Sequence, residues 1–213
     1  MAELLSIDPL SPDAGSIARA ADLLRRGEVI AIPTDTFYGL AANPFDLAAI
    51  EKVFAIKGRP KSNPLLLLVD SIEMAESLSA ELPPGFRHCA ERFWPGPLTI
   101  VVNASPKLPP EVTGNTGTIG LRLPLAPIAV SLIQAAGCPI TATSANRTGE
   151  PDSSSAEQVN RLLGERLPLI LDGGSSRAER PSTVLSLSEE RWKILREGSI
   201  SPGEIAALLD RAP

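Results

Sequence analysis

The sequence is poor in the residue types on which many hydrolases and metalloenzymes depend. Its single histidine, His88, lies in a segment of helical periodicity, where we predict a surface or packing role. Any Ser-His-Asp triad would need this one residue, and a metal site built from several histidines is excluded. The two cysteines, Cys89 and Cys138, form neither a CxxC pair nor a metal-binding spacing, so we predict reduced thiols and no protein-held metal site.

Apolar runs of membrane-spanning length are also lacking. The longest apolar stretch, LLLLV at residues 65–69, has the length of a strand, whereas a membrane-spanning helix needs about 20 apolar residues. The first residues, MAELLSIDPLSPD, do not combine a basic start with an apolar core, as a secretory signal would. We therefore predict a cytoplasmic protein with no membrane contact.

The chain has little excess positive charge and lacks two familiar nucleotide-binding loops. A formal net charge of -5 and a pI of about 5.0 argue against a broad basic face for long nucleic acids. Basic residues are nevertheless concentrated at Lys57, Arg59 and Lys61, so an anionic ligand would be small. Because neither GxxxxGK[ST] nor GxGxxG occurs, any nucleotide would have to bind through other loops.

The remaining composition is that of a globular protein. Of the 213 residues, 43% are hydrophobic and 21% are charged, and the length suits a single domain over residues 1–213 with a core from about 14 to 200. Strands and helices alternate irregularly, and strands cluster towards the end of the chain. We therefore predict an α/β fold with a twisted, open sheet of mixed parallel and antiparallel strands and helices on its faces.

The spacing of apolar residues gives the expected elements. The first predicted helix covers residues 11–26, with Ser11 as N-cap and Pro12 at the first helical position. Further helices are predicted over 47–56, 71–79, 84–93, 127–136 and 155–163, and from residue 201. Strands are predicted over 28–33, 65–69, 98–102, 116–123, 167–172, 183–187 and 192–195, and from residue 139 into a loop that ends at 146.

The segment KGRPKSNP, residues 57–64, is the most distinctive loop. One glycine and two prolines exclude regular structure there and stiffen the backbone, which lowers the entropy cost of binding. Lys57 offers a compact positive charge, and Arg59 offers a planar fork that suits phosphate or carboxylate oxygens. By composition alone, the same segment is equally typical of a solvated surface loop.

Polar side chains gather where two predicted strands end. The segment PTDTFYGL follows a buried strand and brings Thr34, Asp35 and Thr36 to its carboxyl end, where ligands of open α/β sheets usually bind. The segment TATSAN supplies Ser144 and Asn146, each of which can donate and accept hydrogen bonds. Either segment, taken alone, is also explained by an ordinary turn.

Two arginines complete the candidate site. Arg122, in GLRLP, lies inside an apolar strand and needs a partner, which would be a bound carboxylate or phosphate, or a structural Asp or Glu. Arg196, in ILREG, ends a strand before a glycine, a position also common for surface arginines. These segments together place cations and hydroxyls at the ends of several strands, which makes them the candidate ligand site.

In this order, PTDTFYGL, KGRPKSNPL, FWPGPLT, GLRLP, TSAN and STVL…ILREGSI resemble the YrdC family of threonylcarbamoyl-AMP synthases. The blocks extend from about residue 28 to 200, and an ordered set of six is far more specific than any one motif. The resemblance implies a YrdC-like twisted sheet around a concave, positively lined cavity, in the short single-domain form. It also implies a reaction in which L-threonine, bicarbonate and ATP give threonylcarbamoyl-adenylate and pyrophosphate, for modification of tRNA position 37.

The resemblance also assigns roles to residues. The family signature KxR…SxN implies the catalytic residues Lys57, Arg59, Ser144 and Asn146. The implied nucleotide contacts are Lys57, Arg59, Asn63, Thr118, Ser144, Asp152 and Arg196. The implied threonine contacts are Thr36, Leu68, Arg122 and Ala142. Because these groups supply charge and hydrogen bonds rather than acids and bases, we expect positioning and charge stabilisation to provide most of the catalysis.

Two positions depart from the family pattern. Leu68 stands where many longer members have a histidine that touches threonine, and a leucine cannot donate a hydrogen bond. Asp152 stands where a serine is common near the nucleotide, and a carboxylate there would repel phosphates unless a cation intervenes. Mg²⁺ is expected to arrive with ATP, held mainly by phosphates and water.

The family's role in tRNA modification implies further partners. These are the downstream proteins that transfer the threonylcarbamoyl group, and a weak contact with tRNA itself. Two other functions are left open: a YrdC-like paralogue acting on a different adenylate or anion, and an RNA-binding module that uses the same cavity. The acidic pI and the single tyrosine weigh against the module, because few aromatic side chains are available for base stacking.

The loop GGSSRAERPS, residues 173–182, is rich in glycine and serine and precedes Arg196 in the sequence. We predict that it closes over the bound ligand as a mobile lid.

Overall fold

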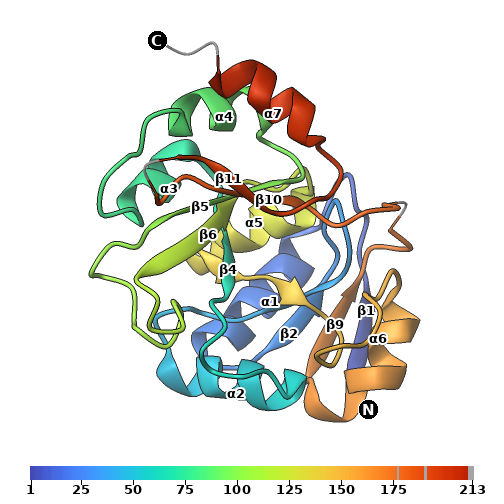
Figure 1. Ribbon diagram of the computed structural model, residues 1–213. Coiled ribbons are helices and arrows are strands. Elements are labelled where there is room, and N and C mark those ends of the chain that lie inside the picture. Colours follow the sequence, from blue (N-terminus) through green and yellow to red (C-terminus); the bar gives the residue numbers. More distant parts are fainter. Residues whose placement is uncertain (177, 190, 211–213) are drawn as a thin grey trace.

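The computed structural model describes residues 1–176, 178–189 and 191–210, and Figure 1 shows a mixed α/β arrangement. The strands of these residues form a five-stranded sheet and a six-stranded sheet. The five-stranded sheet has the order β1 (Glu3–Ser6), β9 (Leu169–Asp172), β2 (Ile30–Ile32), β3 (Gly39–Ala41) and β8 (Thr143–Ser144). The six-stranded sheet has the order β11 (Lys193–Arg196), β10 (Thr183–Ser186), β5 (Leu98–Asn103), β6 (Thr118–Arg122), β4 (Leu66–Leu68) and β7 (Ile140–Thr141).

Both sheets mix parallel and antiparallel pairs, so the predicted α/β class and the mixed character of the sheet are confirmed. In the five-stranded sheet β9 is parallel to β1 and β2, whereas β3 is antiparallel to β2 and β8. In the six-stranded sheet β5 is parallel to β10 and antiparallel to β6, and β4 is parallel to β6. The division into two sheets was not predicted, because the pattern within one strand does not identify its neighbours.

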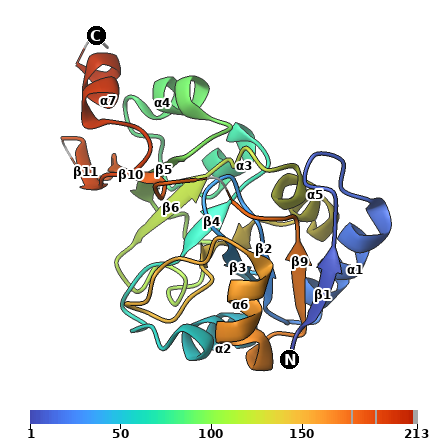
Figure 2. The same ribbon diagram turned by 90° about the vertical axis from the view of Figure 1, so that its right-hand side faces the viewer.

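The helices cover the outer surfaces of the sheets. Their bounds are α1 (Ala14–Arg25), α2 (Leu47–Lys57), α3 (Ile72–Ser77), α4 (Phe86–Phe93), α5 (Pro127–Ala136), α6 (Ala156–Leu163) and α7 (Pro202–Leu209). Figures 1 and 2 both show α4 and α7 at one end of the molecule and α2 and α6 towards the other. Each of these helices was predicted, with ends that differ by a few residues.

The five-stranded sheet is apolar on both faces, because its central strands are covered on both sides. Ile30 and Ile32 of β2 pack with α1 and α5, whereas Ala31 between them faces the larger cluster that includes α2 and α6. Successive side chains of a strand point to opposite faces, so a strand covered on both sides must be apolar throughout. Each fully buried aliphatic side chain of this kind contributes about 1.5–3 kcal/mol to folding.

The six-stranded sheet carries polar residues on one face of its central strands β5 and β6. In β5 and β6, Ile100 and Leu121 belong to the buried core, whereas the alternate positions Thr99, Gly120 and Arg122 face a cavity on the opposite side. This period of two separates a packing face from a polar face within the same strands. The polar face is where the functional site is found.

Three local expectations were wrong or incomplete. Helix α1 is capped by Asp13, whose carboxylate accepts from Ser16 N at 2.8 Å, and not by Ser11, because the helix begins only after Pro12. The segment predicted as a loop after β2 contains β3, whose residues are all buried. Strand β1 was not predicted, because it lies at the edge of its sheet and its residues are largely exposed.

The histidine, the two cysteines and the length of the helices were also subjects of prediction. His88 is exposed, as predicted, and both Cys89 and Cys138 are free thiols. Burial raises the pKa of Cys89 to about 11, which disfavours the reactive thiolate. In the described part of the chain, none of the helices has the length and apolar character needed to cross a membrane.

A pair of glycines before β6 offers a test of how the fold shapes the loop at residues 57–64. Gly114 and Gly117 both have positive φ, 59° and 72°, so alanine is strained at either. Only at Gly114 would the added Cβ meet another loop, 2.5 Å from the main-chain oxygen of Ser62. We expect Gly117→Ala to cost about 1 kcal/mol of unfolding free energy, and Gly114→Ala about 1–3 kcal/mol more, by urea denaturation. Equal losses in the two variants would contradict this packing.

Candidate functional site

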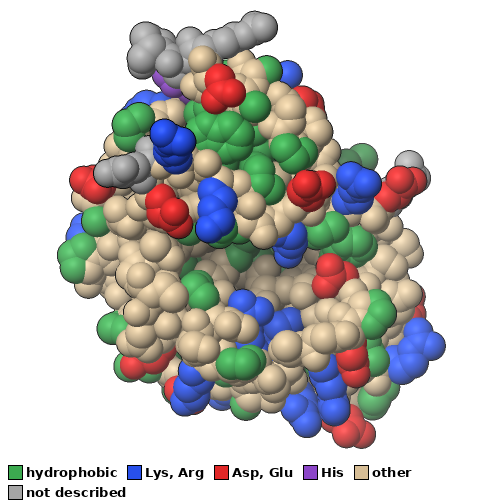
Figure 3. Space-filling view, viewed as in Figure 1, with side chains coloured by type: hydrophobic (Ala, Val, Ile, Leu, Met, Phe, Trp, Pro, Cys, Tyr) green, Lys and Arg blue, Asp and Glu red, His purple; other side chains and the backbone are tan. Residues whose placement is uncertain are grey.

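A cavity of about 400 Å³ lies where the two sheets meet. Its walls come from β4, β5, β6, β10 and β11 of the six-stranded sheet, and from β8 and the segment after β2 of the five-stranded sheet. The space-filling view in Figure 3 shows the surface hollowed at its centre, with basic side chains around the hollow. A cavity of this volume, with apolar strands and a few polar groups in its walls, suits a small ligand.

The structure brings most of the predicted site residues to this cavity. Those that line it are Thr36, Arg59, Leu68, Thr118, Arg122, Ala142, Ser144, Asp152 and Arg196. The predicted residues Lys57, Asn63 and Asn146 are described but are not among the residues of its wall. The threonine set and the nucleotide set therefore share one cavity, although they were predicted from segments far apart in the sequence.

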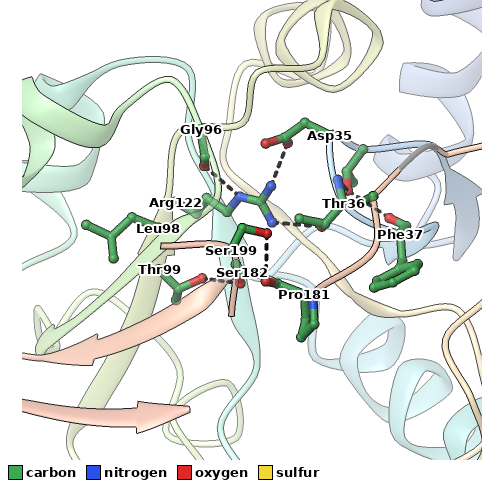
Figure 4. A network of polar contacts seen from close by, with 12 residues as sticks. Asp35, Thr36, Phe37, Gly96, Leu98, Thr99, Arg122, Pro181, Ser182 and Ser199 are labelled. Carbon is green, nitrogen blue, oxygen red and sulfur yellow. Dashed lines mark hydrogen bonds and ion pairs between the residues drawn. The ribbon is translucent and has the colours of Figure 1, made fainter. Parts of the chain in front are cut away.

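Arg122 has a structural carboxylate as its partner, which answers the question left open by the sequence. Its Nη2 lies 2.6 Å from Oδ1 of Asp35, its Nε donates to Gly96 O at 3.0 Å, and its Nη1 donates to Thr36 Oγ1 at 3.0 Å. Figure 4 shows the guanidinium held between these three groups. The side chain is only 4% exposed, so the pair is buried at the cavity wall.

The Arg122–Asp35 contact leaves hydrogen-bonding capacity unused. Nη2 and Oδ1 are close enough to form an ion pair, but neither atom makes a hydrogen bond of good geometry. A buried N–H without a well-aligned acceptor costs free energy, and an added carboxylate could satisfy it. Arg122 is therefore a charged, partly satisfied donor at the wall of the cavity.

Arg196 is held by a second group of polar side chains. Its Nη2 donates to Ser182 O at 2.9 Å and to Ser182 Oγ at 3.0 Å, and Ser182 Oγ lies 2.9 Å from Thr99 Oγ1. Burial lowers the pKa of Arg196, Asp152 opposes that change, and the like charge of Arg122 adds to it. The two arginines thus contribute positive charge to the same part of the cavity.

Arg59 projects from the loop that follows α2. The loop turns at Gly58, which ends the helix in the left-handed conformation. Nη2 of Arg59 donates to Pro64 O at 2.9 Å, and its Nε approaches Asn63 O at 3.4 Å. Asn63 itself is exposed, and its contact with Arg59 is made by its main-chain oxygen. The loop therefore orients Arg59 with its own carbonyl groups.

Lys57 lies behind the cavity wall, and its predicted role at the phosphates stays untested. Its side chain is buried, and Nζ donates to Asn146 Oδ1 at 2.8 Å and to Asn146 O at 3.0 Å, with Ser144 O also in contact. Burial lowers the pKa of Lys57 to about 8, the nearby Arg59 adds to the lowering, and Asp152 opposes it. The ammonium group therefore faces the TSAN segment, not the open cavity.

Asp152 is the acidic member of the cavity wall. Its Oδ1 accepts from Asn146 Nδ2 at 3.1 Å, and its charge acts on both Lys57 and Arg196. Among residues 1–176, 178–189 and 191–210, no group of three or more His, Cys, Asp or Glu side chains is placed to hold a metal ion. A cation at this site would therefore need oxygens from its ligand, with Asp152 adding one carboxylate.

The loop of residues 173–182, predicted to act as a lid, is anchored near both ends. Tyr38 donates from its hydroxyl to Gly174 O at 2.7 Å, and Ser176 N donates to Ser154 O at 2.8 Å. At the other end, Ser199 N donates to Pro181 O at 3.0 Å. Arg177 lies outside the described residues. Closure of the loop over a ligand stays a prediction.

Several wall residues were not predicted. Among them are the hydroxyl-bearing residues Thr99 and Ser182. Thr99 alternates with the core residues Leu98 and Ile100, so a reading of β5 at a period of two would have placed it on the polar face. Ser182 reaches the cavity through the fold of a loop, for which the sequence offers no comparable pattern.

The arginines around a small cavity at the join of two mixed sheets form a site that suits a small anionic ligand. Residues 22–198 match the model of the Sua5/YciO/YrdC family, described as telomere recombination, and the chain belongs to this family. The resemblance stated from the sequence motifs is thereby confirmed.

Individual relatives agree with this assignment. The chain is 40% identical to the threonylcarbamoyl-AMP synthase of Bacillus subtilis over 203 residues, which are 95% of this chain and 59% of that protein. It is 36% identical to a putative threonylcarbamoyl-AMP synthase of Mycobacterium tuberculosis over 202 residues, which are 95% of this chain and 92% of that protein. The structure of Sua5 from Pyrococcus abyssi complexed with L-threonine superposes with a TM-score of 0.94 at 37% identity, covering 99% of this chain and 62% of that one.

The chain thus spans less than two thirds of the length of the Bacillus and Pyrococcus proteins, but nearly all of the Mycobacterium protein.

The low pKa of Lys57 predicts how stability depends on pH. Between pH 8 and 10.5 the unfolded chain keeps a proton on this lysine that the folded protein releases, so the free energy of unfolding should rise with pH. The variant Lys57→Met lacks this titrating group. It keeps the cysteines and Tyr38, which also titrate at alkaline pH, so their contributions cancel in a comparison with wild type. We expect the difference in unfolding free energy, wild type minus variant, to increase from pH 8 to 10 in urea denaturation. A difference that stays constant or falls would show that Lys57 is not buried as described.

Proposed function

We propose that the protein is an L-threonylcarbamoyladenylate synthase, which makes threonylcarbamoyl-AMP and pyrophosphate from L-threonine, bicarbonate or CO₂, and ATP. The observation that carries the proposal is the gathering, in one cavity, of Arg122 beside the apolar side chain of Leu68 and of further arginines near hydroxyl groups. The first environment suits the carboxylate and side chain of an amino acid, and the second suits the phosphates of a nucleoside triphosphate. The names and the structure of the relatives support the same reaction.

The threonine half of the site would be built around Arg122. Its partly satisfied guanidinium suits the α-carboxylate, and Thr36, which accepts from Arg122 Nη1, adds a hydroxyl at the same place. Leu68 lies directly beside Arg122 on the neighbouring strand and offers only methyl groups. Together with Ala142, Leu68 would contact the β-methyl group of threonine rather than its hydroxyl.

The nucleotide half would involve Arg59, Thr118, Ser144, Asp152 and Arg196. Arg59 and Arg196 suit the triphosphate. Burial lowers the pKa of each guanidinium, and a bound anion would oppose this lowering because it stabilises the charged form. Asn63 would contribute through its loop, next to Arg59. Mg²⁺ bound with ATP would be held mainly by phosphates and water, with Asp152 as the protein carboxylate, and would neutralise phosphate charge.

The reaction would need little acid–base chemistry from side chains. The amine of threonine attacks the carbon of CO₂, forming an N–C bond and releasing a proton to solvent. With bicarbonate, the amine proton and the departing hydroxide leave together as one water molecule. A carbamate oxygen then attacks the α-phosphorus, and the bond to the bridging oxygen of pyrophosphate breaks. The protein would act by holding both substrates in line and by stabilising the charge that grows on pyrophosphate.

The product would be used in the cytoplasm. A threonylcarbamoyl-adenylate is a reactive mixed anhydride, so a downstream protein would have to transfer the group to tRNA soon after release. Only a weak contact of this chain with tRNA is proposed, because the net charge is -5.

The reaction is tested by incubation with ATP, radiolabelled bicarbonate and each amino acid in turn. We expect label in an adenylate only when threonine is present, with one pyrophosphate released for each adenylate formed. Label with a different amino acid would favour a paralogue with another substrate. If no label is transferred but tRNA is bound tightly in a salt-sensitive manner, an RNA-binding module would replace the synthase.

Arg59 provides a direct test of the nucleotide half. We expect Arg59→Ala to slow pyrophosphate release at least ~10²-fold, because one cation that stabilises the transition state is lost. Lys61→Ala is the matched control in the same loop, since Lys61 is exposed and pairs with Glu51. Similar rates for the two variants would remove Arg59 from the proposed site.

Asp152 is expected to make nucleotide binding depend on Mg²⁺. Asp152→Asn removes one negative charge from the cavity wall, so ATP without a divalent cation should bind about 3- to 10-fold more tightly than to wild type. The gain in affinity on adding Mg²⁺ should shrink by the same factor in calorimetric titrations. Glu150→Gln, an exposed residue of the same loop, is the control. If both variants respond to Mg²⁺ as wild type does, Asp152 does not face the phosphates.

A further inference from the structure

We propose that Lys57 is a positioning residue that fixes the wall residues Ser144 and Asp152 through its contacts with Ser144 and Asn146, and that it does not contact phosphate. This inference rests on the proposed function in so far as ATP is the ligand whose binding is measured. It changes the role of one member of the KxR…SxN signature, because the lysine and the arginine would act in different ways.

The surroundings of the Lys57 ammonium carry the inference. The residue is 3% exposed, and Nζ is within hydrogen-bonding distance of four oxygens: O and Oγ of Ser144, and O and Oδ1 of Asn146. Three of these, the two main-chain oxygens and Asn146 Oδ1, lie within 3.0 Å. An ammonium group has three N–H bonds, so these three acceptors use its full capacity.

The position of Lys57 relative to the cavity agrees with an ammonium group whose three N–H bonds are already used within the protein. Ser144, Asp152 and Arg59 belong to the cavity wall, whereas Lys57 is not among the wall residues in the described part of the chain. A phosphate could reach Nζ only if the contacts to Asn146 were broken. Those contacts are charge-assisted and buried, so breaking them would leave carbonyl oxygens without donors.

Asn146 passes the effect of Lys57 on to Asp152. Its Oδ1 accepts from Lys57 Nζ and from Ser144 Oγ, both at 2.8 Å, which fixes the orientation of the amide. The Nδ2 group consequently faces Glu150 O at 2.6 Å and Asp152 Oδ1 at 3.1 Å. If the amide lost its lysine partner, it could rotate, and the carboxylate of Asp152 would lose its donor.

The main chain of Lys57 adds a second connection. Its carbonyl oxygen accepts from Thr148 N at 3.0 Å, so side chain and main chain both hold the segment from 144 to 148. Lys57 is also the last residue of α2, two positions before Arg59. The end of one helix therefore sets the positions of two parts of the cavity wall, Arg59 directly and Ser144 through the ammonium group.

The first test compares Lys57→Met with Lys61→Met in the ligand-free protein by amide hydrogen exchange. Methionine matches the length of lysine but donates no hydrogen bond. We expect exchange at residues 144–152 to become at least tenfold faster in Lys57→Met, with the core strands unchanged, and no change in Lys61→Met. ATP affinity should fall about tenfold or more in Lys57→Met only. Unchanged exchange at 144–152 would overturn the proposal.

The second test uses the wild-type protein and does not depend on whether the variant folds. The ¹⁵Nζ resonance of Lys57 is followed by NMR during titration with ATP and Mg²⁺. We expect slow proton exchange before and after saturation, and no coupling to phosphorus. Loss of the contact to Asn146, or a coupling to ³¹P, would show that Lys57 is a phosphate ligand. If wild type binds no ATP at all, the proposed function fails, whereas the exchange experiment still decides the role of Lys57.

Discussion

Between Thr141 and Thr143 the chain leaves the six-stranded sheet and enters the five-stranded sheet, with Ala142 as the single residue between β7 and β8. This change of sheet brings the polar face of one sheet opposite the strand ends of the other, and the cavity occupies the space between them. It also directs Ser144 and Asn146 towards the end of α2. The remaining features of the site, including the contacts of Lys57, depend on this crossing.

Buried positive charge is the second constraint. Arg122 and Lys57 are buried, whereas Arg196 is exposed at the end of β11. Each is held by main-chain, amide or hydroxyl oxygens, and of the three Arg122 alone has a carboxylate within ion-pair distance. Burying a cation is costly unless its donors are satisfied, so such oxygens make the charges tolerable without neutralising the cavity. The result is a site that retains attraction for anions. An amino-acid carboxylate and a triphosphate are the ligands that would use it.

Much of this arrangement could be predicted from the sequence, for reasons that differ between residues. The helices follow from apolar spacing and caps, and Arg122 was marked by its place in an apolar strand. The carboxylate of Asp35 could not be chosen over a bound anion, because pairing across 87 sequence positions depends on the tertiary fold. Likewise, nothing in KGRPKSNP distinguishes Lys57, which turns inward, from Arg59, which lines the cavity, since the difference arises from the end of α2.

We propose above all that threonine and ATP together occupy the cavity between the two sheets. This proposal is tested most directly by a crystal structure of the protein with L-threonine and a non-hydrolysable ATP analogue. We expect the threonine carboxylate on Arg122, its methyl group against Leu68, and the phosphates near Arg59 and Arg196, with Lys57 still bonded to Asn146. Either ligand bound outside this cavity, or phosphate on Lys57 in place of Asn146, would contradict the proposal.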